Sequence, residues 1–196
     1  MNEIKSLLVY CGAHEGYNPS FTQAAKRLGE LMAKEKIKLI YGGGSIGLMG
    51  ILADSVLQNG GEAIGVIPDF LNIKEIGHSG LTQMHRVKSM HERKALMEKL
   101  CDAVIALPGG YGTMDELLEM LTWKQLGLHN KPIGILNING YYNHFLLQLN
   151  RMVEEGFLKT SNRDLLQVGE TIPSLLAKMI STQQVAEEKW MERGQE

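Results

Sequence analysis

Short apolar segments alternate along the chain with segments of helical periodicity, and this alternation constrains the fold more than any other feature. The apolar segments predict strands at Leu7–Tyr10, Leu39–Tyr41, Ala63–Ile67, Ala103–Leu107 and Ile133–Leu136, with a weaker strand-like segment at Met84–Val87. The helical segments are Pro19–Lys34, Gly47–Gln58, Ser89–Leu100, Thr113–Leu126, Tyr142–Glu155 and Pro173–Met191. Because the predicted strands are apolar on both faces, they are typical of a parallel sheet that helices cover on each side. We therefore predict a single Rossmann-like domain over residues 1–196, a three-layer α/β/α structure with a mainly parallel sheet.

The composition is that of a soluble globular protein. A length of 196 residues suits one domain, and contents of 44% hydrophobic and 21% charged residues are ordinary values. No apolar run approaches the roughly 20 residues of a membrane span, and the first residues lack the apolar region of a signal peptide. The net charge of −2 gives no reason to expect a nucleic-acid partner. We therefore expect a cytoplasmic enzyme or binding protein that acts without a membrane.

The cysteines and histidines predict neither a disulfide nor a metal site. Cys11 follows one predicted strand and Cys101 precedes another, which places them at opposite edges of a parallel sheet, roughly 15 Å or more apart. That separation exceeds the reach of a disulfide. No closely spaced Cys or His pair occurs, and the six histidines are scattered along the chain.

The run Leu107-Pro-Gly-Gly-Tyr-Gly-Thr-Met-Asp-Glu116 predicts a phosphate-binding turn between a strand and a helix. Glycines let backbone N–H groups approach an anion closely, and a helix N-terminus favours negative charge. We expect Asp115 and Glu116 in the first turn of the helix, where the helix dipole favours ionised carboxylates. The alternative is a plain strand-to-helix turn closed by a capping box, with Thr113 as the N-cap residue.

A second glycine turn, Gly42–Gly47, fits the pattern G-x-G-x-x-G and also lies between a strand and a helix. Its dinucleotide-binding version needs an acidic residue at the end of the next strand, and Asp69 lies near that position. Pro68 and the long loop that follows disturb this match. Two glycine turns in one small domain favour a mononucleotide over NAD. The segment that follows the first predicted strand, residues 11–14, should reach the same edge of the sheet.

The helix predicted over Ser89–Leu100 carries Arg93 in the middle of an apolar face. An unpaired buried charge is costly, so this guanidinium needs an anion, either a substrate or Glu116. The alternative is that Arg93 extends along its own aliphatic stem to the surface.

Five segments of the chain are similar to sequence motifs of a known family. They are Val9-Tyr-Cys-Gly12, Tyr41-Gly-Gly-Gly-Ser-Ile-Gly-Leu-Met-Gly50, Gly65-Val-Ile-Pro68, Met90-His-Glu-Arg-Lys94 and Pro108-Gly-Gly-Tyr-Gly-Thr-Met-Asp-Glu116. On these segments the chain resembles, over almost its whole length, the Lonely Guy family of cytokinin-activating phosphoribohydrolases, once widely labelled lysine decarboxylases. The last segment fills every fixed position of the signature PGGxGTxxE. One departure is the segment Cys11–His14, where many members carry serines after the glycine, and it affects the fine contacts of that loop.

The resemblance implies hydrolysis of the N-glycosidic bond of a nucleoside 5′-monophosphate, to a free base and ribose 5-phosphate, without a cofactor. It implies that Arg93 and Glu116 are the catalytic pair, that Gly109 to Thr113 hold the phosphate, and that Lys94, Thr122 and Glu75 contribute to nucleotide binding. A fixed carboxylate stabilises the oxocarbenium-like state of glycosidic bond cleavage. Because the helix dipole favours the ionised form, we expect Glu116 to serve as an electrostatic partner, a nucleophile or a water-activating base rather than a proton donor. The predicted substrate-binding residues are Gly43, Gly44, Glu75, Met90, Lys94, Gly109, Gly110, Tyr111, Gly112, Thr113, Asp115 and Thr122.

Other functions stay open at this stage. A nucleotide- or cofactor-binding carrier or sensor would share the fold without turnover, although a passive phosphate site gains nothing from an acid at its rim. An NAD-linked oxidoreductase is a third possibility. The sequence also predicts a homodimer, or a larger assembly built from dimers, because apolar residues wrap most of the helix Thr113–Leu126 and the family resemblance indicates the same. The alternative is that neighbouring helices of the same chain bury its second face.

Overall fold

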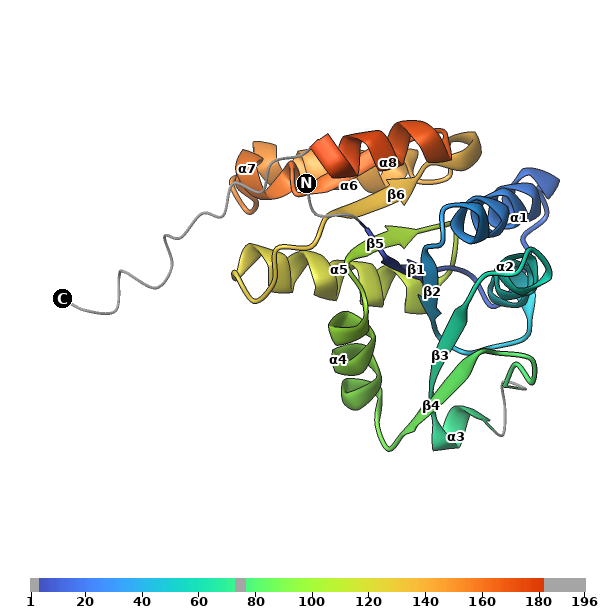
Figure 1. Ribbon diagram of the computed structural model, residues 1–196. Helices are drawn as coiled ribbons and strands as arrows, with labels where there is room; N and C mark the ends of the chain where they lie inside the picture. Colours follow the sequence, from blue (N-terminus) through green and yellow to red (C-terminus); the bar gives the residue numbers. More distant parts are fainter. Residues whose placement is uncertain (1–3, 73–76, 182–196) are drawn as a thin grey trace.

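Within residues 4–72 and 77–181, which the computed structural model describes, seven parallel strands form one sheet in the order β4-β3-β2-β1-β5-β6-β7 (Figure 1). The strands are β1 Ser6–Tyr10, β2 Lys38–Tyr41, β3 Ala63–Pro68, β4 Gln83–Val87, β5 Ala103–Ala106, β6 Ile133–Leu136 and β7 Leu166–Gly169. The prediction of a parallel sheet in a three-layer α/β/α fold is confirmed.

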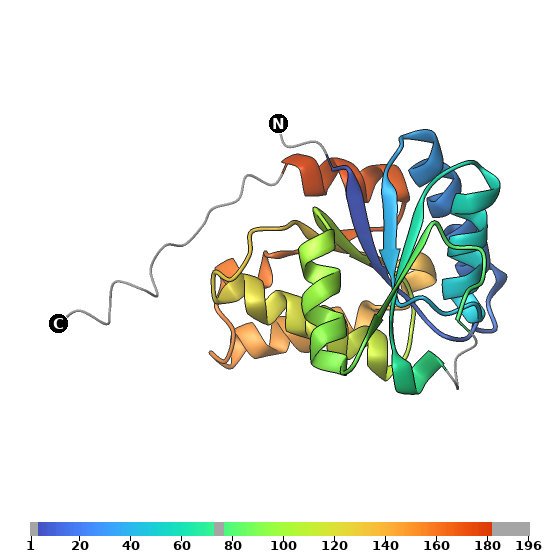
Figure 2. The same ribbon diagram turned by 60° about the horizontal axis from the view of Figure 1, so that its bottom comes forward.

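Helices cover both faces of the sheet, as both views show (Figures 1 and 2). One face packs against α1 Pro19–Lys34, α2 Gly47–Gln58 and α8 Ile172–Ser181, and the other against α4 Met90–Leu100, α5 Tyr111–Gln125 and α6 Asn143–Glu154. The remaining helical segments are short: α3 Asp69–Asn72, α7 Thr160–Arg163 and the 3₁₀ turn η1 Ile138–Gly140. Side chains alternate between the layers, so that in β1 Leu7 and Val9 join the first core and Leu8 and Tyr10 the second.

The strand order reverses between β1 and β5. Leu7 pairs with Leu39 of β2 on one side and with Ala103 of β5 on the other. The chain therefore leaves β1 toward one half of the sheet and leaves β5 toward the other half. In open α/β sheets this divergence opens a crevice beyond the carboxyl ends of the two strands, where ligands bind.

One residue of the β1 loop connects this crevice to both glycine turns. The Gly12 N–H donates to the Pro108 carbonyl at 3.0 Å, and the Gly12 carbonyl accepts from the Leu48 N–H at 3.0 Å. Gly47 lies in the left-handed region with φ at +59°, and a Cβ there would overlap the backbone of Ala13. The loops after β1, β2 and β5 are thus packed together.

Several elements differ from the sequence prediction. The prediction did not include β7, because this edge strand carries Gln167 and is fully buried only at its two ends. It also missed the four-residue helices α3 and α7, which are too short for a helical period. The helix predicted from Pro173 begins at Ile172, and its predicted end at Met191 lies outside the described residues. Cys11 and Cys101 are both buried free thiols.

In the described part of the chain, no helix combines the length and the apolar character that a membrane crossing requires.

Candidate active site

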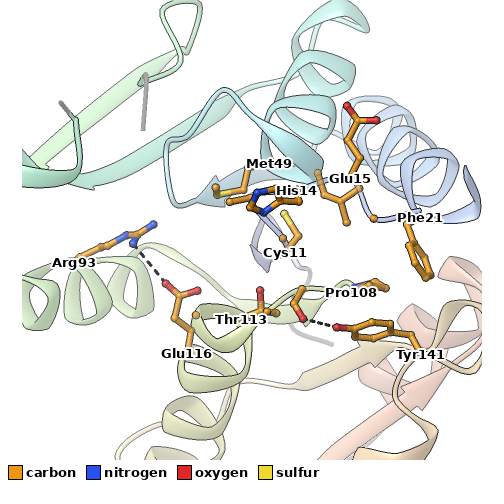
Figure 3. A pocket seen from close by; sticks show the side chains of 17 residues that line it. Cys11, His14, Glu15, Phe21, Met49, Arg93, Pro108, Thr113, Glu116 and Tyr141 are labelled. Atoms are coloured by element: carbon orange, nitrogen blue, oxygen red, sulfur yellow. Dashed lines mark hydrogen bonds and ion pairs between the residues drawn. The ribbon is translucent and has the colours of Figure 1, made fainter. Parts of the chain in front are cut away.

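A cavity of about 500 Å³ lies at the crevice between the carboxyl ends of β1 and β5 (Figure 3). Its wall is formed by the loop after β1, the start of α2, the turn after β5, the start of α5 and three further side chains. The lining residues are Cys11, Gly12, Ala13, His14, Glu15, Gly16, Phe21, Leu48, Met49, Arg93, Pro108, Gly109, Gly110, Gly112, Thr113, Glu116 and Tyr141. Arg93 and Glu116 lie at one end of this cavity, and Phe21 and Tyr141 lie at the other.

The turn after β5 and the first turn of α5 contribute Gly109, Gly110, Gly112 and Thr113 to the cavity wall. Gly110 is the N-cap residue of α5, with φ −92° and ψ −152°, and no side chain caps the helix. Among the described residues, none accepts a hydrogen bond from the amides of residues 109–113. A Cβ added at Gly110 or Gly112 would meet open space. Consecutive unpaired amides at a helix N-terminus form an anion-binding site.

The capping-box alternative for this turn is wrong. The helix begins at Tyr111, so Thr113 is its third residue rather than its N-cap. The Thr113 side chain is buried beneath the turn, where a Cβ on Gly109 would overlap its hydroxyl. Gly109 is therefore needed for close packing of the turn against Thr113.

Arg93 is buried and its guanidinium is held in place by main-chain carbonyls. Its Nε donates to the Val66 carbonyl at 3.1 Å and its Nη2 to the Gly42 carbonyl at 3.2 Å. Its Nη1 lies 3.9 Å from Oε1 of Glu116, and Figure 3 shows the two side chains facing each other. A Cβ on Gly42 would overlap Nη2 of Arg93, which explains a glycine at this position. The alternative in which Arg93 extends to the surface is wrong.

The sequence predicts Glu116 in the first turn of the helix with an ionised carboxylate, and the structure differs on both points. Glu116 is the sixth residue of α5, beyond the first turn, where the helix dipole acts weakly. Its side chain is only 12% exposed. Burial raises the pKa of Glu116 from 4.5 to about 7, against the opposing effects of Arg93 and Lys94. The expectation that the helix dipole keeps this carboxylate ionised is therefore wrong, because desolvation dominates.

Lys94 and Asp115 form an ion pair at the edge of the site rather than inside it. Lys94 Nζ lies 2.8 Å from Asp115 Oδ2 and 3.2 Å from Glu119 Oε2. Burial lowers the pKa of Lys94, but the hydrogen bonds to these two carboxylates outweigh it and the pKa is raised. This pair connects α4 to α5 and so fixes the two helices that carry Arg93 and Glu116.

The structure brings about half of the predicted site residues together in the cavity. Those that line it are Arg93, Glu116, Gly109, Gly110, Gly112 and Thr113. Those that do not line it are Gly43, Gly44, Met90, Lys94, Tyr111, Asp115 and Thr122. Glu75 lies outside the described residues.

Three of the residues outside the lining have other contacts. The Gly43 carbonyl accepts from the His78 N–H at 3.0 Å, and Gly44 forms a β-bridge with Gly77. Thr122 is exposed, and its hydroxyl donates to the Leu118 carbonyl within α5. Asp69, the acid considered for a dinucleotide ribose, is exposed at the start of α3 and does not line the cavity.

Sequence reasoning missed several side chains of the cavity wall. His14 and Glu15 belong to the β1 loop, which the strand-end rule places at this edge without identifying individual contacts. Phe21 and Tyr141 come from α1 and from the residue after η1, and apolar periodicity alone does not distinguish them from core residues. Cys11 also lines the cavity, and burial raises the pKa of its thiol well above the usual range, so it stays protonated. The described residues hold no cluster of three or more His, Cys, Asp or Glu side chains suited to a metal ion.

Comparisons with known proteins identify the family of the chain. The sequence model of a family described as "Possible lysine decarboxylase" matches residues 49–179. A probable cytokinin riboside 5′-monophosphate phosphoribohydrolase of Arabidopsis thaliana is 44% identical over 178 residues, which cover 91% of this chain and 89% of that protein. A probable enzyme of the same name from Oryza sativa subsp. japonica is 47% identical over 173 residues, covering 88% of this chain and 78% of that protein.

Solved structures support the fold. A molybdenum cofactor binding protein from Rippkaea orientalis matches with a TM-score of 0.66 and 21% identity, over 90% of this chain and 95% of that one. A molybdenum cofactor carrier protein from Chlamydomonas reinhardtii matches with a TM-score of 0.65 and 18% identity, over 89% and 95%. At this level of identity the likeness concerns the fold alone.

Proposed function

The chain belongs to the family whose curated members are named cytokinin riboside 5′-monophosphate phosphoribohydrolases, and on this premise we propose that it is an N-glycosyl hydrolase. Its substrate is adenosine 5′-monophosphate or an N6-modified form of it. The products are ribose 5-phosphate and the free base, adenine or a cytokinin. The family model carries a decarboxylase description, but no lysine is among the described residues that line the cavity.

The observation that carries this proposal is the placement of the unpaired amides of residues 109–113 beside a buried carboxyl in one cavity. The amides suit a 5′-phosphate. Glu116 follows Thr113 by three residues, about 5 Å along the helix axis, so a ribose attached to a bound phosphate reaches its carboxyl. Phosphate recognition and glycosidic chemistry thus share one helix end.

In this proposal Glu116 is the base that activates water. Its ionised form takes a proton from a water molecule, whose oxygen bonds to C1′ of the ribose. The bond from C1′ to the base nitrogen breaks, and its electron pair leaves with the base. The base takes up a proton from solvent, and Glu116 releases the proton of the attacking water to solvent. A base with a pKa of about 7 is well matched to neutral pH, because it is partly ionised and still binds a proton strongly.

Arg93 supports this step without exchanging protons. A guanidinium stays charged at neutral pH. Held by two carbonyls and 3.9 Å from Glu116, it stabilises the ionised carboxylate and fixes its direction. We also propose binding roles for six residues of the family motifs that do not line the cavity: Gly43, Gly44, Met90, Lys94, Tyr111 and Asp115. Thr122 and Glu75 are proposed on the family resemblance alone.

The test is release of base from a panel of substrates by the purified protein. We expect free adenine from adenosine 5′-monophosphate, or the free modified base from its N6-prenylated form, detected by chromatography together with ribose 5-phosphate. Adenosine, which lacks the phosphate, should be a far poorer substrate. Tight nucleotide binding without any base release would contradict hydrolysis and would identify a carrier.

We propose further that the protein acts as a homodimer in the cytoplasm. The dimer rests on two apolar residues that the single chain leaves exposed, Leu118 of α5 at 40% and its C-cap residue Leu126 at 52%. Of the other apolar residues of that helix, Tyr111 is exposed at its start. The rest, Met114, Leu117, Met120, Leu121 and Trp123, belong to the second core.

A further inference from the structure

Two consecutive tyrosines hold the phosphate-binding turn. The Tyr141 hydroxyl donates to the Gly109 carbonyl at 2.6 Å, and the Tyr142 hydroxyl donates to the Leu107 carbonyl at 2.6 Å. The intervening Pro108 carbonyl accepts from the Gly12 N–H at 3.0 Å. Three successive carbonyls of the turn are therefore held from outside it, and Figure 3 shows the tyrosine contact at the end of the cavity opposite Arg93.

These contacts fix the direction of the free amides. In a trans peptide the carbonyl and the N–H of the next residue lie in one rigid plane and point in opposite directions. Holding the Pro108 and Gly109 carbonyls therefore sets the directions of the Gly109 and Gly110 N–H groups, the first two of the unpaired row. Glycine by itself gives these peptides wide rotational freedom.

The Tyr141 side chain is itself held firmly. Its ring meets Phe21 of α1 edge-on at a centroid distance of 5.7 Å and Tyr142 at 5.0 Å. The backbone reaches it through a tight turn in which Asn139 and Gly140 have positive φ values of 52° and 67°. Buried Asn137 closes this turn by accepting from the Tyr142 N–H at 2.8 Å. The hydroxyl of Tyr141 is thus a fixed donor.

We propose that Tyr141 is a positioning residue that aims the Gly110 amide at the phosphate of the substrate. This rests on the proposed function in that the anion bound by the turn is a 5′-phosphate. Tyr142 provides an internal contrast, because the carbonyl that it holds belongs to the peptide bond of Pro108, which has no N–H to aim. Tyr142 therefore supports the fold of the turn, and Tyr141 supports its ligand.

The experiment compares Tyr141→Phe with the parent protein and with Tyr17→Phe, whose side chain is fully exposed. The measurements are the affinity for ribose 5-phosphate by calorimetry, kcat/KM for adenosine 5′-monophosphate and for adenosine, and the melting temperature. We expect Tyr141→Phe to weaken ribose 5-phosphate binding roughly three- to tenfold, the effect of one hydrogen bond. The melting temperature should stay the same, because the contact is exposed and water can replace the lost hydroxyl, whereas the Tyr142 contact is buried. The loss should appear in kcat/KM for the nucleotide but not for adenosine, and Tyr17→Phe should match the parent. Tyr142→Phe should show the opposite pattern, a lower melting temperature with a smaller change in binding.

Two results would overturn the assignment of Tyr141. One is parent-like affinity of Tyr141→Phe for ribose 5-phosphate, and the other is an equal loss of kcat/KM for nucleotide and nucleoside. If the parent binds ribose 5-phosphate more tightly than Tyr141→Phe but releases no base, the positioning role stands and the hydrolase proposal fails. If the parent neither binds ribose 5-phosphate nor releases base from adenosine 5′-monophosphate, both fail.

Discussion

Glu116 illustrates how two effects of opposite sign compete at one side chain. A charge at a helix N-terminus gains roughly 0.3–1 kcal/mol from the dipole, and only within the first turn. The rise of the pKa of Glu116 from 4.5 to about 7 corresponds to about 3 kcal/mol in favour of the neutral form. Position in the sequence reveals the first effect, whereas the second depends on burial in the folded chain. Burial dominates here, and it turns an ordinary carboxylate into a base suited to neutral pH.

Replacing Glu116 by glutamine should remove catalysis and spare binding. The substitution keeps the size of the side chain but removes the proton acceptor, so we expect turnover of adenosine 5′-monophosphate to fall about a hundredfold or more. Affinity for ribose 5-phosphate should change little. The matched control is Glu62→Gln, which alters a half-exposed surface pair with Lys38. Near-parental turnover of Glu116→Gln would mean that this carboxyl has no catalytic role.

The same carboxyl should make both rate and stability depend on pH. As a base it must be ionised, so kcat/KM should rise with pH and level off above about pH 7. For stability, the folded pKa of Glu116 lies above the unfolded value of 4.5. Its neutral form therefore favours the fold below pH 4.5, and this contribution is lost as the pH rises through about 7. Relative to the parent, Glu116→Gln should thus become more stable between pH 4.5 and 8, by up to about 3 kcal/mol.

Denaturant unfolding of both proteins across this pH range measures the stability difference. The residual activity of Glu116→Gln serves as the control for the rate profile, since the substrate phosphate titrates with a pKa of about 6. If the pH dependence of kcat/KM has the same shape in Glu116→Gln as in the parent, it is caused by titration of the substrate phosphate rather than of Glu116. A stability difference that is flat with pH would contradict the raised pKa of Glu116.

At the scale of elements, the residues at the start of α5 must both pack closely to form the turn and leave space for a ligand. Thr113 and Gly109 pack against each other and shape the turn, while Gly110 and Gly112 face open space. Neither Gly110 nor Gly112 has a positive φ, so the backbone itself would accept other residues there. Their lack of a side chain is explained by the ligand that we propose.

The substitution Gly112→Ala distinguishes the effect of this residue on stability from its effect on ligand binding. Gly112 is the second residue of α5, and alanine favours helix by up to about 1 kcal/mol over glycine. We therefore expect an unchanged or slightly raised melting temperature together with roughly tenfold weaker binding of ribose 5-phosphate, because a methyl group enters the space of the anion. Gly80→Ala, in an exposed turn, provides the control. Parental affinity in Gly112→Ala would show that no ligand occupies the space beside this residue.

The sequence predicts well those helices and strands whose hydrophobic pattern depends only on residues close together in the chain. Apolar strands and amphipathic helices are set by neighbours along the chain, and α1 and α2 begin and end where expected. The glycine turns and Arg93 were also identifiable, because a charge on an apolar face and glycines between strand and helix are unusual. Tyr141 and Phe21 were not, since their meeting in the cavity depends on how β6 and α1 lie across the sheet.

At the scale of the whole molecule, the cavity is supported from both layers of helices. Arg93 and Glu116 come from α4 and α5 on one face of the sheet, and Phe21 comes from α1 on the other. Because α5 carries both the amide row and Glu116, any contact that shifts this helix should alter the site. The exposed residue Leu118 of this helix and the exposed C-cap residue Leu126 are the basis of the proposed dimer.

Light scattering at micromolar concentration should give a mass near twice the 21.8 kDa of one chain. Leu118→Glu places a charge on the proposed interface, so we expect a monomer with reduced turnover, because the dimer holds the start of α5 in place. The control is Ile180→Glu on α8, exposed on the other face of the sheet. A parent mass near 21.8 kDa would contradict the dimer, and a fully active monomeric Leu118→Glu would contradict its link to catalysis.

The unpaired amide row has a consequence for exchange with solvent deuterium. Amides without an acceptor exchange quickly wherever water reaches them, and residues 110–112 are exposed. Yet their backbone is held by fixed carbonyls and by a helix, so in the free protein rapid deuteration should mark a rigid segment rather than a loose one. Ribose 5-phosphate should slow the labelling of these residues while leaving that of the exposed turn around Gly80 unchanged. Among the fast-labelled helix starts of this protein, the one that the anion slows is the anion site.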